Sequence, residues 1–517
     1  MELYDNNIFY LASFLGCFLL QFVWNKLRQR ETVAPAEDRI IQLTNAVFCI
    51  CLTLAISTLF RLFPGNNRFP SRDSSVFLYI GKRMTEGKIP YLDLFDHKGP
   101  ILYFIEYIGM TICKTSFSGV WLLEVLSMMA TIALMQKLGK KVSNRHSSIY
   151  LAILACMGVC GWKIWQGGNF TEEYALPWIT LAAIVFYSFF QTGSYRWYEI
   201  ILLGTGFVTV FLLRANMIAI WVALMPVVLV LMVKRKQFLD ILKCMALFLA
   251  GVAIVLLPVF IYSKLTNSLN AMWQNYMLFN ISYTDGTSSV GDRLRLALFF
   301  SKTLWPGVLA IIITLLTHPE KKVLWANMLF FIVSLCFVTL SGRGYYHYAI
   351  ILLPSFILPV TVLFEMTDSL LGGGDNLTGR PVVIIISSLL ILTAALAYRV
   401  TSSGTDILDP LVKYIQEQTS EDDDVLILGN SCWYYLMADR KTDNCYFYQL
   451  PPAEISTAVY NGFINELTAK PSKLVVLPGT SDERELIDIS LMGIREMLFE
   501  KGYTSDEYDE FEAFWLH

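Results

Sequence analysis

Titratable side chains gather in residues 66–104, a short stretch of a chain that otherwise avoids charge. Asp73 lies near the start of the stretch, and Asp96, His97 and Lys98 are consecutive near its end. A carboxylate can accept a proton, and a lysine can hold a phosphate group through charge-assisted hydrogen bonds. The stretch therefore has the residue types needed for chemistry on a hydroxyl group or an anionic ligand.

A charged stretch of this kind is often only a solvated connector between two helices. Here the apolar residues Val76, Phe77, Leu78 and Ile80 are interleaved with the charges. This pattern instead favours a helix that lies on a membrane surface. It would place Asp73 at the start of the helix, at the boundary between water and lipid.

Three further short segments carry polar groups beside apolar runs. Glu172 and Glu173 directly precede an apolar run, where acidic residues are often only partners of the helix dipole. Arg214 separates two apolar runs, and the segment GRGYYHY contains Arg343, Tyr346 and His347. Arginines at a membrane surface often only extend toward water. Together with Lys98, they could instead hold a phosphate or pyrophosphate group.

The composition predicts a membrane protein. The chain has 517 residues, of which 55% are hydrophobic and 16% charged, and its mean hydropathy is +0.51. A typical soluble protein has about 25% charged residues. The chain has no arginine-rich tract that would follow a phosphate backbone, so we expect no nucleic-acid partner.

The elements that position the polar groups are apolar helices. Crossing the hydrocarbon core takes roughly 20 apolar residues, and about twelve windows are long enough or nearly so. They cover residues 8–22, 41–63, 120–135, 149–164, 175–190, 198–213, 217–233, 241–262, 296–317, 323–340, 348–364 and 382–398. The fold class expected is an all-α, multi-pass protein of the cell membrane.

The basic loops orient these spans. Loops 26–30, 137–145, 234–236 and 321–322 are rich in Lys and Arg and fall on one side, which the positive-inside rule assigns to the cytoplasm. The opposite, extracytoplasmic side then carries every polar segment named above. It also carries Arg214 and Arg343, which the orientation rule does not explain.

Two parts of the chain are predicted to lie outside the cytoplasm. The first outer loop, residues 66–116, would contain a juxtamembrane helix at 101–113, because counting that segment as a span would place the basic loop 137–145 on the wrong side of the membrane.

Residues 1–399 would form the transmembrane domain and residues 400–517 a small α/β domain. In the latter, 425–430 and 473–479 read as buried strands and 411–417 and 486–500 as amphipathic segments. Cys432 and Cys445 are expected to form a disulfide.

The first outer loop resembles a known family. An aspartate beyond an early span, a surface helix, the turn HKGP (97–100) and the aromatic-rich helix LYFIEYIGM (102–110) are similar to the first outer loop of GT-C glycosyltransferases. The similarity is greatest to the bacterial branch related to protein O-mannosyltransferases and the lipid A aminoarabinose transferase, and it includes TEEYALP (171–177). That family often has an Asp-Glu pair where this chain has Asp73 and Ser74.

The resemblance implies transfer of a sugar from a polyprenyl-phosphate-linked donor to an acceptor on the extracytoplasmic face, with inversion. The acceptor would be a glycan such as a cell-wall or surface glycopolymer, a lipid or a protein. Asp73 would be the catalytic base and Lys98 a ligand of the donor phosphate, with Arg214 and Arg343 as further phosphate ligands. Acceptor or substrate contacts are expected from Asp96, His97, Glu172, Glu173, Tyr346 and His347. The missing second carboxylate leaves the role of a divalent cation open.

Two rival functions remain. A transporter or flippase of lipid-linked saccharides would place ionisable groups near the middle of the membrane and tends to have two related halves, neither of which the sequence displays. A non-catalytic glycan-binding membrane protein would use the C-terminal domain without chemistry.

Overall fold

The computed structural model describes residues 6–28, 38–66, 68–158, 164–285, 289–370, 381–402 and 409–516, which form two compact units. Met1–Phe63, Trp121–Val259 and Thr284–Ser402 make up the helical unit. Pro64–Val120, Phe260–Tyr283 and Ser403–His517 make up the mixed unit. Arg30, in one of the basic loops that orient the predicted spans, lies outside the described residues.

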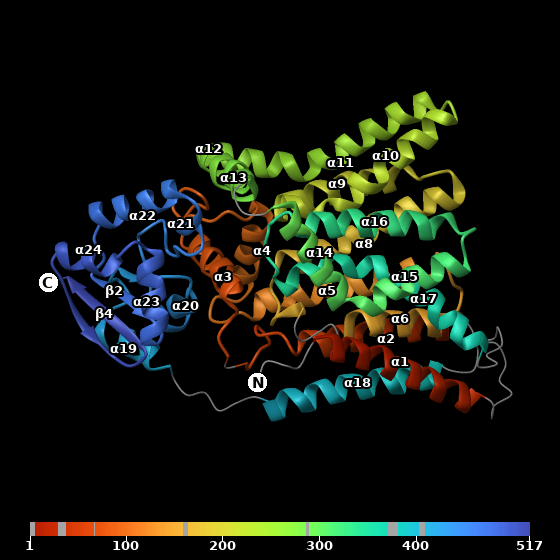
Figure 1. The fold of residues 1–517 in the computed structure, drawn as a ribbon, viewed down its shortest axis with the longest axis horizontal. Coiled ribbons are helices and arrows are strands. Elements are labelled where there is room, and N and C mark those ends of the chain that lie inside the picture. The colour runs from red at the N-terminus through yellow and green to blue at the C-terminus, as the bar shows by residue number, and fades with distance from the viewer. Residues whose placement is uncertain are drawn as a thin grey trace. The chain divides into compact units, whose positions relative to one another are not determined.

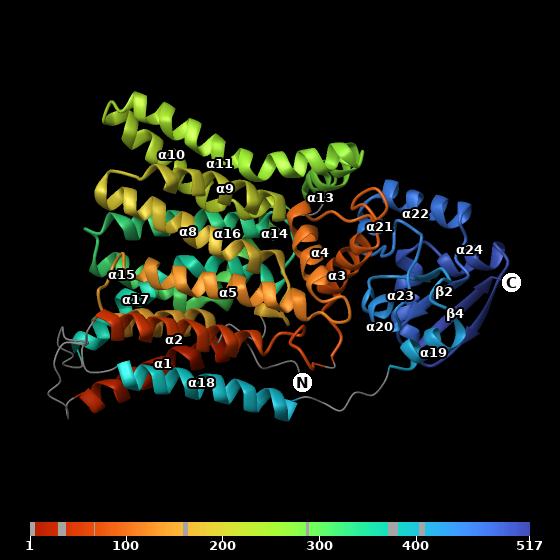
Figure 2. The same ribbon diagram turned by 180° about the vertical axis from the view of Figure 1, so that it is seen from behind.

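The helical unit is a bundle whose helices lie side by side in Figures 1 and 2. Its helices are α1 (Asn6–Arg28), α2 (Asp38–Ser57), α5 (Ser118–Gly139), α6 (His146–Ile153) with η1 (Leu154–Gly158), α8 (Thr171–Thr192), α9 (Trp197–Leu213), η2 (Ala215–Met217), α10 (Ala219–Lys234), α11 (Phe238–Leu265), α14 (Val290–Thr303), α15 (Trp305–Thr317), α16 (Lys322–Thr339), η4 (Tyr346–Leu352), α17 (Leu353–Leu370) and α18 (Pro381–Ser402).

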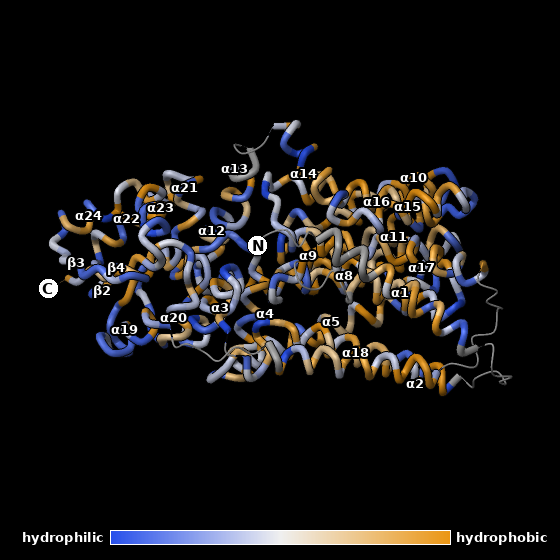
Figure 3. The backbone as a smooth tube through the Cα atoms, turned by 60° about the horizontal axis from the view of Figure 1, so that its bottom comes forward, coloured by the Kyte–Doolittle hydropathy of each residue, from blue (hydrophilic) through white to orange (hydrophobic). Residues whose placement is uncertain are grey.

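Among the described residues, seven helices are long and apolar enough to cross a membrane, or eight if the bent pair α14–α15 is one span. The span Tyr346–Leu370 is the most enclosed of them, with 83% of its apolar window buried. In α11 and in α18, only 11% of the apolar window is buried. The apolar side chains of these two helices therefore face outward, as expected for helices in contact with lipid. Figure 3 shows the hydrophobic colouring concentrated on the helices of this unit.

One predicted span is interrupted. The window 296–317 contains the end of α14 and all of α15, which meet at 85°. The break falls at Leu304, and Pro306 follows within the first turn of α15. Proline cannot donate a backbone hydrogen bond and clashes with the preceding turn, so it favours a new helix start over a continuous helix.

Small residues allow α9 and α11 to approach closely. A Cβ atom placed at Gly204 of α9 would lie 2.1 Å from the carbonyl oxygen of Phe248. One placed at Gly251 of α11 would lie 2.0 Å from the carbonyl oxygen of Ile201. Without a hydrophobic driving force between helices in lipid, such close backbone packing is a main source of helix association.

The mixed unit contains the first-loop helices α3 (Arg72–Thr85) and α4 (Pro100–Ile112) and the short helices α12 (Leu269–Met272), η3 (Trp273–Leu278) and α13 (Phe279–Asp285). Its C-terminal part contains α19 (Pro410–Gln418), β1 (Val425–Ile427), α20 (Trp433–Ala438), α21 (Pro452–Ile455), α22 (Thr457–Ala469), β2 (Leu474–Pro478), α23 (Ser481–Ser490), α24 (Ile494–Glu500), β3 (Tyr503–Glu507) and β4 (Phe511–Leu516).

The four strands form one sheet in the order β1-β2-β4-β3. β1 pairs parallel with β2, and the other two pairings are antiparallel. Leu426 and Val475 from the sheet pack with Phe463 of α22 in a buried core that also includes Phe95 of the first loop. The predicted small C-terminal sheet with helices is therefore confirmed, and it lies in blue in Figure 2.

The predicted disulfide is wrong. Cys432 and Cys445 both carry free thiols. The Cys445 thiol instead donates a hydrogen bond to the carbonyl oxygen of Leu92, 3.7 Å away, and Cys432 is fully buried. Burial raises the pKa of both thiols, that of Cys445 to about 12.

Candidate functional site

Helix α3 carries Asp73 as the sequence predicts, in the first turn of a helix that Ser71 caps. The Ser71 hydroxyl oxygen accepts a hydrogen bond from the backbone N–H of Ser74 at 3.4 Å, which is the usual role of serine at this position. Asp73 is half-buried. In the part of the chain that the structure describes, its carboxylate makes no hydrogen bond or ion pair.

The apolar side of α3 is not open to lipid as predicted. Val76, Phe77, Leu78 and Ile80 are all buried, because α3 packs against α4 and α20 inside the mixed unit. The helix itself is confirmed, but its apolar residues contact protein.

Asp96 is almost completely buried, with 1% of its surface exposed. Its carboxylate accepts hydrogen bonds from the Tyr448 hydroxyl (2.5 Å), the Tyr103 hydroxyl (2.8 Å) and the His97 backbone N–H (2.6 Å). Buried charge is tolerated only when it is well hydrogen-bonded. Asp96 is therefore a buried, hydrogen-bonded carboxylate that does not face the solvent.

His97 links Asp96 to Lys98. Its Nδ1 lies 3.2 Å from Oδ1 of Asp96, and its Nε2 lies 3.0 Å from Nζ of Lys98. A lysine ammonium group can only donate, so Nε2 must accept, and the ring proton must be on Nδ1, facing the Asp96 carboxylate. The contacts among Asp96, His97 and Lys98 thus fix the tautomer of His97 and hold the Lys98 ammonium group beside the imidazole ring.

The backbone of this turn is also held. The Tyr91 hydroxyl donates to the carbonyl oxygen of Lys98 at 2.6 Å, and the Asn280 side chain donates to that of His97 at 2.7 Å. Gly99 and Pro100 then start α4, with proline in the first turn, where its missing N–H costs nothing. Lys98 is consequently positioned by both its side-chain and its main-chain contacts.

Electrostatics support an ionised Asp96. Burial alone would raise the pKa of this carboxyl, but the hydrogen bond from His97, the positive charge of Lys98 and the hydrogen bond from Tyr448 bring it below its usual range. The pKa of Tyr448 lies well above its ordinary value, through burial first and the charge of Asp96 second, with a smaller effect of Asp73. Asp73 thus lies within electrostatic reach of this cluster.

In the helical unit, two of the predicted residues form an ion pair. Nη1 of Arg214 lies 2.7 Å from Oε1 of Glu172, whose other oxygen accepts from the Thr171 hydroxyl at 2.8 Å. The guanidinium group also lies over the ring of Tyr348, 4.0 Å from its centroid. Glu172 and Arg214 therefore neutralise and orient one another.

His347 lies close to this pair in an aromatic stack. Its ring is parallel to that of Phe170 at 4.3 Å and to that of Tyr345 at 5.7 Å, and its Nδ1 lies 2.8 Å from the side-chain oxygen of Gln166. Tyr346 points elsewhere, with its ring 5.3 Å from that of Phe299.

The remaining predicted residues are placed as follows. Arg343 lies in the turn before η4, where its backbone N–H donates to the Ser341 hydroxyl at 3.4 Å. Glu173 is buried beside Glu124 of α5. Sequence reasoning missed Glu124, although a lone carboxylate inside an apolar window is a signal of a site.

Tyr103, Gln166, Tyr348 and Tyr448 were also missed as partners of the predicted residues. Nothing in the sequence distinguishes them from ordinary interface aromatics and amides.

The described residues contain no group of three or more His, Cys, Asp or Glu side chains placed to hold a metal ion.

Two solved structures have a similar fold. Two structures of ArnT from Cupriavidus metallidurans resemble this one, with TM-scores of 0.57 for the form bound to undecaprenyl phosphate and 0.59 for the apo state. Sequence identity is 13% and 11%, and the matches cover 92% and 90% of this chain and 97% and 96% of the ArnT chains. The chain therefore has the GT-C fold.

A protein-family model also matches this chain. The model described as "Putative competence-induced protein Ccs4 N-terminal domain" matches residues 36–370, and the chain belongs to that family. A comparison with curated protein sequences found no match.

Proposed function

We propose that this protein is a membrane glycosyltransferase that moves a sugar from a polyprenyl-phosphate-linked donor to a hydroxyl-bearing acceptor. The observation that carries the proposal is Lys98, a cation directed by a buried Asp96–His97 pair in a chain with the GT-C fold. The similarity to a structure that holds undecaprenyl phosphate supports a lipid-phosphate donor. The sugar would be a hexose or a pentose.

In this proposal, Asp73 and Lys98 act on opposite ends of the displacement. The acceptor hydroxyl gives its proton to Asp73 while its oxygen bonds to the anomeric carbon. The bond from that carbon to the phosphate oxygen breaks, and polyprenyl phosphate leaves with the electron pair. Lys98 stabilises the negative charge of the leaving phosphate. A single displacement of this kind inverts the anomeric configuration.

The residues of the helical unit take supporting roles. Arg214, oriented by Glu172 and Tyr348, and Arg343 are proposed as further phosphate ligands. His347 and Tyr346 are proposed to contact the acceptor or the sugar, as aromatic rings can stack on sugars. Glu172, paired with Arg214, and Glu173, beside Glu124, are both buried.

Orientation and extent complete the proposal. The reaction would take place on the extracytoplasmic face of the cell membrane, with about twelve spans within residues 1–399, the first outer loop at 66–116 and an extracytoplasmic domain at 400–517. The acceptor would be a cell-wall or surface glycopolymer, a lipid or a protein.

A cleavage assay separates this function from its rivals. Purified protein in lipid vesicles would be given a set of synthetic polyprenyl-phosphate sugars and candidate acceptors. Release of free polyprenyl phosphate together with a glycosylated product is the expected result. A flippase would move the lipid across the bilayer with its phosphate–sugar bond intact, and a binding protein would only retain it.

A further inference from the structure

A segment of the C-terminal part, residues 439–448, lies along the first loop within the mixed unit. The backbone N–H of Phe95 donates to the carbonyl oxygen of Cys445 at 2.9 Å. The backbone N–H of Thr442 donates to the Tyr79 hydroxyl of α3 at 3.1 Å. These bonds join residues more than 340 positions apart in the chain, so they set how the segment is aligned with the loop.

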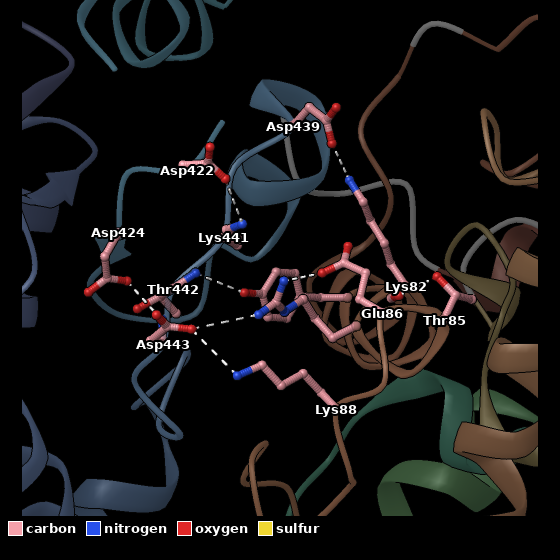
Figure 4. A network of polar contacts seen from close by, with 12 residues as sticks. Lys82, Thr85, Glu86, Lys88, Asp422, Asp424, Asp439, Lys441, Thr442 and Asp443 are labelled. Atoms are coloured by element: carbon pink, nitrogen blue, oxygen red, sulfur yellow. Dashed lines mark hydrogen bonds and ion pairs between the residues drawn. The ribbon is translucent and has the colours of Figure 1, made fainter. Parts of the chain in front are cut away.

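Ion pairs hold the start of the same segment, as Figure 4 shows. Lys82 of α3 pairs with Asp439. Arg83 and Lys88 both approach Asp443, at 3.9 and 3.5 Å. A single exposed ion pair contributes little to stability. Arg83, however, is only 3% exposed, and several pairs together fix the alignment of the segment with α3.

The segment ends at Tyr448, which is buried and whose hydroxyl donates to Oδ1 of Asp96. Asp96 in turn holds the proton on Nδ1 of His97, which leaves Nε2 to receive Lys98. The C-terminal part thus supplies one of the three donors on which the direction of Lys98 depends.

We infer that Tyr448 is a positioning residue of the donor-phosphate site, and that the C-terminal part completes that site; this inference rests on the proposed function. Without the Tyr448 hydroxyl, the buried Asp96 carboxylate loses a short hydrogen bond and is held in place less firmly. Its hold on the His97 proton then weakens, and Lys98 is no longer fixed toward the phosphate.

Tyr448 also packs against Phe447 and Phe95, so its loss could act through folding alone. Tyr503 provides the matched control. It is as buried as Tyr448, at 3% exposed, lies in the same C-terminal part, and donates its hydroxyl proton to the carbonyl oxygen of Ser472 at 2.7 Å. Each Tyr→Phe change therefore removes one buried hydroxyl, and only one of them touches Asp96.

The test measures the dissociation constant of undecaprenyl phosphate, which binds without reacting, for the full-length protein in detergent. Tyr448→Phe is expected to weaken binding by about tenfold, as loss of a hydrogen bond to a charged group does. Tyr503→Phe should bind like the wild type. In a Lys98→Ala background, Tyr448→Phe should have no further effect, because a residue that acts through Lys98 is silent without it.

The outcomes are distinct. If the wild type binds undecaprenyl phosphate and the two Tyr→Phe variants weaken that binding equally, Tyr448 has no positioning role. The role is also overturned if Tyr448→Phe weakens binding as much in the Lys98→Ala background as it does in the wild type. Failure of the wild type to bind undecaprenyl phosphate would instead overturn the proposed donor class, and the positioning role with it.

Discussion

Asp96 illustrates how a single buried charge can organise a surface site. The carboxylate does not face the solvent, yet through His97 it determines which way the Lys98 ammonium group is held. Lys98, which we propose to bind the donor phosphate, is therefore separated by one side chain from the buried carboxylate that positions it. The sequence places the three residues together but does not tell which of them is buried.

Replacing Asp96 by Asn should destabilise the protein at neutral pH by about 1.5 to 3 kcal/mol, because the amide nitrogen in place of Oδ2 cannot accept from the Tyr103 hydroxyl and the remaining hydrogen bonds lose their charged acceptor. The pKa of Asp96 is below its usual range in the folded protein. Its ionised form therefore stabilises the fold above the unfolded-state pKa of about 3.9, and this stabilisation is lost as the pH falls further.

Thermal unfolding of wild type and Asp96→Asn in detergent between pH 7 and pH 3 measures this effect. The difference in midpoint should be largest at neutral pH and should shrink as the pH falls below about 4. Asp509→Asn, at an exposed position of the C-terminal part, should match the wild type throughout. A difference that stays constant down to pH 3 would contradict an ionised Asp96.

The elements show where sequence periodicity succeeds and where it stops. Apolar runs predicted most helices of the bundle, and alternation of charge with Val76 and Phe77 predicted α3, because burial imposes these patterns. The break at Leu304 and the burial of α3 against α20 depend on contacts between distant segments. Periodicity within one segment carries no information about those contacts.

The close approach of α9 and α11 gives a prediction at this scale. Gly204→Ala should destabilise the helical unit by about 1 to 3 kcal/mol, because its Cβ would lie 2.1 Å from a backbone oxygen that cannot turn away. Gly16→Ala in α1 is the matched change, since nothing lies within 4 Å of its Cβ.

The measurement is the thermal midpoint of both variants in detergent. Gly16→Ala should be neutral or slightly stabilising, as alanine favours helix over glycine. Equal midpoints for the two variants would mean that α9 and α11 do not pack as closely as described.

For the whole molecule, function depends on which face of the membrane carries the site. The fold was within reach of the sequence because the first outer loop has a recognisable order of aspartate, helix and HKGP turn. The partners from the C-terminal part were not, because Tyr448 is 352 residues from Asp96 and has no distinctive sequence neighbours.

The orientation is tested with single cysteines in a background without native cysteines. Lys470→Cys, at an exposed end of α22, should react in intact cells with a thiol reagent that does not cross membranes. Lys234→Cys, at the exposed end of α10, should react only after the cells are opened. The reverse pattern would place the proposed site in the cytoplasm.

The most direct test of the account is transfer by Asp73→Asn. The variant preserves the size of the side chain and leaves the Ser71 cap of α3 intact, but it cannot accept a proton at neutral pH. With a synthetic polyprenyl-phosphate sugar and a saturating acceptor, turnover should fall by about 10² to 10⁴, the usual contribution of a general base, while donor affinity changes little. Near wild-type turnover by folded Asp73→Asn protein would contradict the account.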